Sequence, residues 1–311
     1  MSSFAAILQA VVPVFLLIGL GHLLRRLNFF TPALVEGLSR LVFYVAVPAL
    51  LYDSISNSDL GRTFDWVVAS TAWVLVSTIA FALYLASRRL KPDLRGSFVQ
   101  GIFRSNLAFV GLPICEGAYG TPALAPAAVF IGLMVPLFNF LAVLVLLLPH
   151  HSGNLRNSLR PIARGLVTNP FIIGSGLGIA AAAAHFTLPA LLGTSVEWVG
   201  RIALPLALLA LGGSLKFKRL RAKTSLIALA ASVKLIFYPA LYLAGLLLFH
   251  RSGLLLQVPV ILLATPTAVV SYITAREMKG SEELASGIVM ATTLVSALTL
   301  PAWLWVLSHF A

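Results

Sequence analysis

The chain contains ten long apolar segments that are separated by short polar connections. A transmembrane helix needs about 20 mostly apolar residues to cross the hydrocarbon core of a bilayer, and each segment is close to that length. Only 10% of the 311 residues are charged, against about 25% in an ordinary soluble domain. We therefore predict an all-α, multi-pass integral membrane protein with ten transmembrane helices, near residues 4–24, 33–52, 66–86, 97–116, 122–148, 165–184, 196–215, 224–249, 255–275 and 284–308.

Lys and Arg are distributed unevenly between the connections. Sixteen of the 22 basic residues fall in the odd-numbered connections, whereas the even-numbered ones hold only Arg62 and Arg251. By the positive-inside rule, both termini then face away from the cytoplasm. Orientation in a lipid bilayer thus explains the net charge of +12, and we expect no nucleic-acid partner. The sixteen residues are Arg25, Arg26, Arg88, Arg89, Lys91, Arg95, Arg156, Arg160, Arg164, Lys216, Lys218, Arg219, Arg221, Lys223, Arg276 and Lys279.

The two halves of the sequence are related by an internal repeat. A shift of 157 residues aligns Pro13 with Pro170. At the same shift, two further prolines of the first half align with prolines of the second half, and two glycines align with glycines. Because each half holds five helices, an odd number, the second half enters the membrane from the opposite side. We predict an inverted repeat of residues 1–150 and 151–311, an arrangement typical of secondary transporters.

The fourth and ninth segments carry polar and helix-breaking residues near their centres. Proline lacks a backbone N–H and its ring clashes with the preceding turn, so it frees carbonyl groups in mid-membrane. Half-helices that start after Asn106 and after Pro266 would point their positive dipole ends at a shared site, which suits a carboxylate substrate. The candidate residues are Arg104, Ser105, Asn106, Gly111 and Pro113 in the fourth segment and Thr265, Pro266 and Thr267 in the ninth.

Other interpretations of these polar residues stay open. The prolines can act as simple kinks, and the hydroxyl and amide groups can join neighbouring helices by hydrogen bonds. Arg104 either binds an anion or contacts helix-end carbonyls. Arg40, Arg201 and Lys234 are interpreted as structural, since the first two lie near segment ends and Lys234 is long enough to snorkel.

Several kinds of functional site are missing from the sequence. None of the ten acidic residues lies at the centre of a segment, so there is no obvious intramembrane carboxylate to carry a proton or a sodium ion. The six histidines lie at segment ends or in connections, and Cys115 is the only cysteine, so we expect no metal site and no cofactor. Without an ATP-binding motif or a hydrolytic triad at membrane depth, we expect no enzymatic activity.

Short motifs are spread along these segments. The second segment contains Val45-Ala46-Val47-Pro48, the fourth Gly111-Leu112-Pro113, the sixth Asn169-Pro170 and the ninth Ala275-Arg276-Glu277. In this order and spacing they resemble the Phe-Ala-Val-Pro, Gly-Ile-Pro, Asn-Pro and Ala-Lys-Glu of the auxin efflux carrier family. That family includes bacterial permeases and the plant PIN-type auxin carriers.

The resemblance implies a fold and a set of site residues. It implies ten helices in an inverted five-plus-five repeat, with broken helices four and nine crossing at the substrate site. Asn106 and Pro266 fall on crossover residues of the family, while Ser105 replaces the proline of the first crossover. Val47 matches a substrate-lining valine, and Leu51 stands where plant members have a serine.

The resemblance also implies a division of labour and a substrate class. Helices 1, 2, 6 and 7 would form a scaffold, and helices 3–5 and 8–10 a transport bundle that moves in elevator-type alternating access. The scaffold is commonly dimeric, so we expect a homodimer. Bacterial relatives are associated with small organic anions such as malate and malonate.

These features predict a secondary active or potential-driven transporter of a small organic anion, such as malate, malonate or an auxin-like acid, in a bacterial-type plasma membrane. In this hypothesis Asn106 and Thr267 donate hydrogen bonds to the substrate carboxylate, and Arg104 supplies a countercharge. Proton coupling through the substrate is favoured over sodium coupling. The alternative is a non-transporting membrane sensor or regulatory subunit that uses the same pocket, and a lipid-handling role is a third hypothesis.

Overall fold

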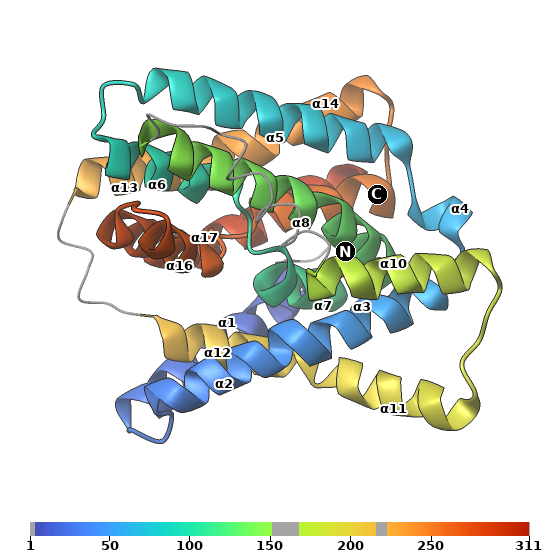
Figure 1. Ribbon diagram of the computed structural model, residues 1–311. Helices are drawn as coiled ribbons and strands as arrows, with labels where there is room; N and C mark the ends of the chain where they lie inside the picture. Colours follow the sequence, from blue (N-terminus) through green and yellow to red (C-terminus); the bar gives the residue numbers. More distant parts are fainter. Residues whose placement is uncertain (1–3, 151–167, 216–222, 311) are drawn as a thin grey trace.

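The computed structural model describes residues 4–150, 168–215 and 223–310, which are helical apart from turns, short connections and one isolated pair of extended residues (Figure 1). Within these residues, seven helices are long and apolar enough to cross a bilayer: Ala5–Arg26, Pro32–Ser56, Trp66–Ala86, Thr121–Leu147, Ala190–Ser214, Thr224–Leu248 and Glu282–Phe310. Three shorter apolar helices cover Leu107–Tyr119, Pro170–Ala183 and Leu254–Ala264. The predicted all-α, multi-pass membrane protein is confirmed, while the ten-helix inverted repeat stays a prediction.

The elements follow the order of the apolar segments. They are α1 (Phe4–Arg26), α2 (Pro32–Leu41), η1 (Val42–Ala46), α3 (Val47–Ser56), α4 (Leu60–Thr63), α5 (Trp66–Ala86), α6 (Pro92–Phe103), η2 (Leu107–Gly111), α7 (Leu112–Tyr119), η3 (Thr121–Ala123), α8 (Leu124–Leu147), η4 (Leu148–His150), α10 (Pro170–Ala183), α11 (Ala190–Arg201), α12 (Ala203–Ser214), α13 (Thr224–Ser232), η6 (Val233–Phe237), α14 (Tyr238–Leu248), α15 (Leu254–Ala264), α16 (Val270–Glu277), α17 (Glu282–Leu307) and η7 (Ser308–Phe310).

Some helix boundaries differ from the sequence expectation. The fourth segment begins at Pro92 instead of residue 97, and the seventh begins at Ala190 instead of residue 196. The first turn of α6 contains Asp93 and Arg95, which a search for apolar windows passes over, whereas α11 begins with the apolar Ala190-Leu191-Leu192. The sixth begins at Pro170, where the Asn169 side chain caps the helix, and the expected residues 165–167 lie outside the described residues.

Seven of the sixteen basic residues that predict the orientation lie outside the described residues, namely Arg156, Arg160, Arg164, Lys216, Lys218, Arg219 and Arg221. The direction of the termini therefore stays a prediction.

Three helices contain one π-helical turn that ends two residues before a proline. The wider turn is closed by an N–H that donates to the carbonyl five residues back, as Leu112 does to Leu107. Proline lacks an N–H and its ring clashes with the carbonyl four residues back, so the wider turn relieves the clash. The helices consequently continue past these prolines, which are Pro48, Pro113 and Pro239.

Close backbone contacts join the first and second segments to the sixth and seventh. α1 packs along α12, and α3 packs against α10 and α11 (Figure 1). A Cβ added at Gly212 would collide with the backbone carbonyl of Ile18, and one added at Gly174 would collide with the backbone of Pro48. Small residues let helices in membranes approach backbone to backbone. The division into scaffold and bundle, like the two repeats, stays a prediction.

Candidate functional site

The fourth and ninth segments meet where their backbones are extended. After the ends of α6 and α15, the two segments pair in an antiparallel bridge between Ser105 and Thr267. The structure thus brings together the residues predicted from both segments. Two backbone hydrogen bonds flank the bridge, from Asn106 N to Pro266 O at 2.8 Å and from Ala268 N to Arg104 O at 2.9 Å.

Hydroxyl groups at the bridge cap the half-helices reciprocally. Ser105 Oγ donates to Leu263 O at 3.1 Å, and Thr267 Oγ1 donates to Gly101 O at 2.5 Å. Leu263 lies four residues before Thr267, and Gly101 lies four residues before Ser105. In a continuous helix each of these carbonyls would accept a hydrogen bond from the backbone N–H four residues further along. A buried carbonyl without a partner is costly, so these hydroxyls stabilise the two breaks.

The half-helices after the bridge begin at different distances from it. η2 begins directly after Asn106, as predicted. The prediction that the second half-helix begins after Pro266 is wrong, because α16 begins at Val270. The N–H of Ala268 is held by the carbonyl of Arg104, which keeps this stretch extended.

Arg104 lies at the crossing and is buried. Its Nη1 donates to Thr274 Oγ1 at 3.1 Å, and its Nη2 donates to Asn139 Oδ1 at 2.6 Å. Both acceptors are neutral side-chain oxygens rather than helix-end carbonyls. No carboxylate pairs with Arg104 within the described parts of the chain. Its positive charge therefore lacks an acidic partner in this part of the protein.

Lys234 is fully buried, and the interpretation that it snorkels is wrong. Its Nζ donates to Ser105 Oγ at 2.5 Å and to Leu263 O at 2.7 Å, and lies 4.6 Å from the centre of the Tyr238 ring. Lys234 lies in the π turn η6, and its side chain is directed inward. A second basic side chain thus reaches the crossing, again without an acidic partner among the described residues.

The polar groups predicted to bind substrate differ in their availability. The hydroxyls of Thr265 and Thr267 already donate, to Leu262 O and Gly101 O. Asn106 is buried, and its Nδ2 has no partner among the described residues. Asn106 is therefore the predicted donor that a ligand could engage without breaking an existing hydrogen bond.

The other predicted residues lie beside the bridge rather than in it. Gly111 ends the π turn η2 and packs against Leu262, while Pro113 lies in the first turn of α7. The chain breaks before both of them, at residues 104–106. Val47 and Leu51 are buried in α3, on one helix face, and the structure does not place either of them in the bridge.

Sequence reasoning missed three polar residues that support the crossing. Thr292 Oγ1 accepts from Thr267 N at 3.1 Å, and Asn139 and Thr274 hold Arg104. The sequence does mark Asn139, because it is the only amide side chain in the otherwise apolar helix α8. An isolated amide in an apolar span needs a partner in a neighbouring helix.

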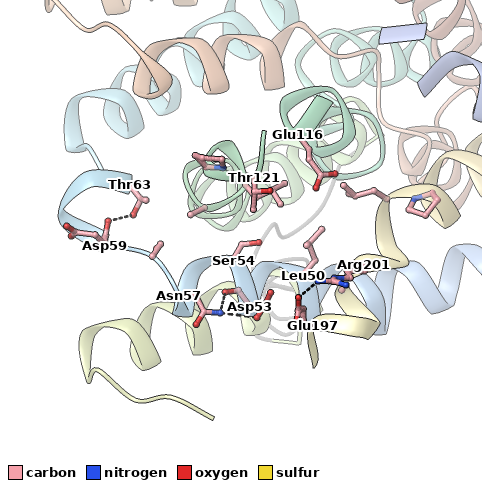
Figure 2. A pocket seen from close by; sticks show the side chains of 17 residues that line it. Leu50, Asp53, Ser54, Asn57, Asp59, Thr63, Glu116, Thr121, Glu197 and Arg201 are labelled. Atoms are coloured by element: carbon pink, nitrogen blue, oxygen red, sulfur yellow. Dashed lines mark hydrogen bonds and ion pairs between the residues drawn. The ribbon is translucent and has the colours of Figure 1, made fainter. Parts of the chain in front are cut away.

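A cavity of about 680 Å³ lies between α3, α4 and α11 on one side and α7 and α8 on the other. Figure 2 shows Asp53 and Ser54 facing Glu116 and Thr121 across it. Leu50, next to Leu51 in the chain, also lines the cavity. None of the residues paired at the crossing lines it. The cavity, called the vestibule below, lies at the end of the molecule that carries the connections after α3 and α7.

The vestibule is acidic. Four carboxylates line it, and among the side chains that the structure describes Arg201 is the only cation that lines it. Arg201 pairs with Glu197 at 2.5 Å, and both side chains are largely exposed. Asp53 accepts from Asn57 Nδ2 at 3.0 Å. The carboxylates are Asp53, Asp59, Glu116 and Glu197.

Comparison with known proteins identifies the family. A family model described as membrane transport protein matches residues 6–304. The chain belongs to this family. The resemblance to the auxin efflux carriers is thereby confirmed, because this is the family that contains them. Members of the family are transporters, not enzymes, and the protein is a multi-pass membrane transporter.

Named relatives extend over almost the whole chain. An uncharacterized transporter of Methanothermobacter thermautotrophicus is 26% identical over 95% of this chain and 96% of its own. A proposed malonate transporter of Rhizobium meliloti is 28% identical over 97% of this chain and 96% of its own. An uncharacterized transporter of Methanocaldococcus jannaschii is 22% identical over 96% of this chain and 98% of its own.

Proposed function

We propose that the protein is a secondary transporter of a small organic anion, with the substrate carboxylate bound at the crossing. The observation that carries the proposal is the pair of buried basic side chains, Arg104 and Lys234, which flank the bridge without an acidic partner among the described residues. Burying a charge is costly unless an opposite charge or good hydrogen bonds compensate it. A site with excess positive charge favours an anion.

Asn106 supports the same proposal. Its amide Nδ2 is buried at the crossing and has no partner in the described chain. Unpartnered buried donors are rare, and a carboxylate oxygen is a strong acceptor for them. We therefore assign Asn106 as the neutral donor and Arg104 as the countercharge, while Pro266 keeps the ninth segment broken.

The family relative with a named substrate points to the same chemistry. The Rhizobium meliloti protein carries the name of a malonate transporter, and it aligns with almost the whole of this chain. We infer a small dicarboxylate such as malonate or malate as the substrate class. A monocarboxylate such as indole-3-acetate is the comparison compound.

Alternating access requires the buried crossing to reach each side of the membrane in turn. We propose that the vestibule is one access route, and that Val47 and Leu51 separate the crossing from it. Relative movement of helices 3–5 and 8–10 against helices 1, 2, 6 and 7 would open the route. The site would then be shared by the two inverted repeats.

We propose that the membrane potential drives the transport of the anion. Moving one elementary charge is worth about 2.3 kcal/mol per 100 mV, which supports a gradient of roughly fifty-fold. Four carboxylates at the vestibule lower the local anion concentration and slow entry from that side. With this end placed outside the cytoplasm of a bacterial-type cell, as the positive-inside rule predicts, the membrane potential favours export. We expect the transporter to be a homodimer.

Counterflow in proteoliposomes tests this function. The purified protein is reconstituted, and uptake of labelled malonate, malate and indole-3-acetate is measured with and without an imposed potential. Wild type is compared with Asn106→Ala and Pro266→Ala, and with Gln9→Ala at an exposed position of α1 as a matched control. We expect saturable, potential-sensitive counterflow of a dicarboxylate in wild type and in the control, and its loss in both crossing variants.

Two results would contradict the proposal. Counterflow that persists at the wild-type rate in Asn106→Ala and Pro266→Ala would move the site away from the crossing. Absence of counterflow for all three anions, together with ligand-induced thermal stabilisation, would favour the sensor alternative.

A further inference from the structure

The carbonyl groups at the end of α15 need partners from outside their own helix. In a continuous helix, Leu262 O and Leu263 O would accept from residues 266 and 267. Pro266 has no N–H, and the N–H of Thr267 donates instead to Thr292 Oγ1. Leu262 O receives the hydroxyl of Thr265, whereas Leu263 O receives Ser105 Oγ and the Lys234 ammonium.

Oxygen atoms of this kind bind cations in other carriers. Unwound backbone carbonyls and the C-terminal ends of half-helices coordinate sodium ions or protons in transporters with broken helices. Here Leu263 O comes from the C-terminal end of a half-helix, and Ser105 Oγ comes from the break in the other repeat. Both oxygens lie within 2.7 Å of Lys234 Nζ, and the Tyr238 ring faces the same nitrogen. Two oxygens and one aromatic ring, all of them groups that attract a cation, thus surround the nitrogen.

We propose that Lys234 is a built-in cation: its ammonium group permanently occupies a monovalent-cation site formed by the oxygens of the two crossovers. Other carriers bind a dissolved cation at such a site. Here the positive charge belongs to a side chain of η6. The crossing is therefore assembled without a dissolved metal ion. Removal of the side chain opens a site for a small monovalent cation.

The built-in cation also explains how the first crossover works with Ser105 at its break. A serine hydroxyl accepts one hydrogen bond while it donates another, so Ser105 relays between Lys234 and Leu263 O. A proline at residue 105 would have no group for either role. Lys234 thus ties η6, the break after α6 and the end of α15 into one unit. The built-in cation implies that transport does not depend on sodium, and this consequence rests on the proposed function. The existence of the cation site itself does not rest on the proposed function.

Chemical rescue tests the site directly. Lys234→Ala removes the ammonium group and three methylene groups, which n-propylammonium matches in shape and charge. Lys234→Met removes the charge but fills the space, so it is the matched control. The thermal unfolding midpoint of each full-length protein in detergent is measured with choline chloride, sodium chloride, n-propylammonium chloride and the neutral analogue 1-propanol.

The proposal makes a specific prediction for this series. Lys234→Ala should unfold at a lower temperature than wild type, and millimolar n-propylammonium should raise its midpoint by about 3 °C or more. Wild type and Lys234→Met should not respond, and 1-propanol should have no effect on any of the three. An equal response of Lys234→Ala to 1-propanol and n-propylammonium would show a cavity that accepts any filler, and would overturn the cation site. No response of Lys234→Ala to any cation would overturn it as well.

A transport measurement separates a functional cation from a purely structural one. Malonate counterflow by wild type should proceed at the same rate in sodium and in choline salts. Counterflow by Lys234→Ala should be about tenfold faster with n-propylammonium or sodium than with choline. Sodium stimulation of wild type, or rescue of stability without rescue of transport, would overturn the functional claim. Absence of wild-type counterflow would count against the proposed function alone, because the unfolding series still tests the site.

Discussion

Ser105 and Thr267 face each other across the crossing, and each hydroxyl donates to a carbonyl four residues before the other. The arrangement is reciprocal, so each broken helix carries the cap of the other. The two breaks therefore depend on one another. Movement of either segment alone would leave buried carbonyls without partners, and we infer that the two segments move together.

Loss of one hydroxyl should destabilise the protein. Thr267→Val keeps the shape of the side chain but leaves Gly101 O without its donor, at a cost of about 1–3 kcal/mol. Thermal or denaturant unfolding in detergent measures this cost. Thr299→Val is the matched control, because Thr299 Oγ1 is buried without a partner among the described residues and its removal should change stability by less than about 0.5 kcal/mol. Equal effects of the two substitutions would contradict the capping role.

The charge of Arg104 should determine anion affinity. Arg104→Gln removes the charge beside the bridge while it keeps a donor for Asn139, and we expect malonate affinity to fall by tenfold or more, about 1.4 kcal/mol. Titration of labelled malonate with purified protein measures the change. Arg88→Gln, at an exposed position after α5, should bind malonate as wild type does. Unchanged affinity in Arg104→Gln would remove Arg104 from the substrate site.

The contact between α1 and α12 should be sensitive to added volume. Gly212→Ala places a Cβ against the backbone carbonyl of Ile18, so we expect destabilisation of about 1–3 kcal/mol. Gly19→Ala, in the same pair of helices, meets no atom within 4 Å and should be neutral or stabilising by up to about 1 kcal/mol. Unfolding midpoints of both variants, measured side by side, check the prediction. A stable Gly212→Ala would mean that the helices are further apart than the structure has them.

The acidic vestibule should slow anion entry. Glu116→Gln removes one of its four carboxylates, and we expect malonate uptake through this side to rise by about two- to threefold at low ionic strength. The gain should shrink near 0.1 M salt, where the screening length is about 10 Å. Initial rates at two salt concentrations measure it, with Glu283→Gln, outside the vestibule, as control. A gain that does not depend on salt would point to a local structural cause.

The residues of the crossing could be selected from the sequence because they are chemically out of place. Arg104, Asn106 and Pro266 are polar or helix-breaking groups in apolar segments, and such groups need partners at membrane depth. Asn139 is out of place in the apolar helix α8 in the same way, but no local pattern shows that it or Thr292 contacts the crossing.

Lys234 shows the limit of sequence reasoning most clearly. A lysine in an apolar helix can extend its ammonium to the membrane surface or turn it inward, and both courses are open to the same sequence. The π turn at Val233–Phe237 and two oxygens from distant segments decide in favour of the inward course.

The amino-acid sequence by itself determined the membrane class, the positions of the apolar helices, the family and the two segments that break. These properties follow from hydropathy, from proline chemistry and from short motifs, all of which are local along the chain. Only the tertiary structure decided which hydroxyl caps which carbonyl, where α16 begins and where the Lys234 charge lies. Those outcomes depend on groups more than a hundred residues apart in the chain, because a buried polar group takes whichever partner the packing of the helices brings within hydrogen-bonding distance.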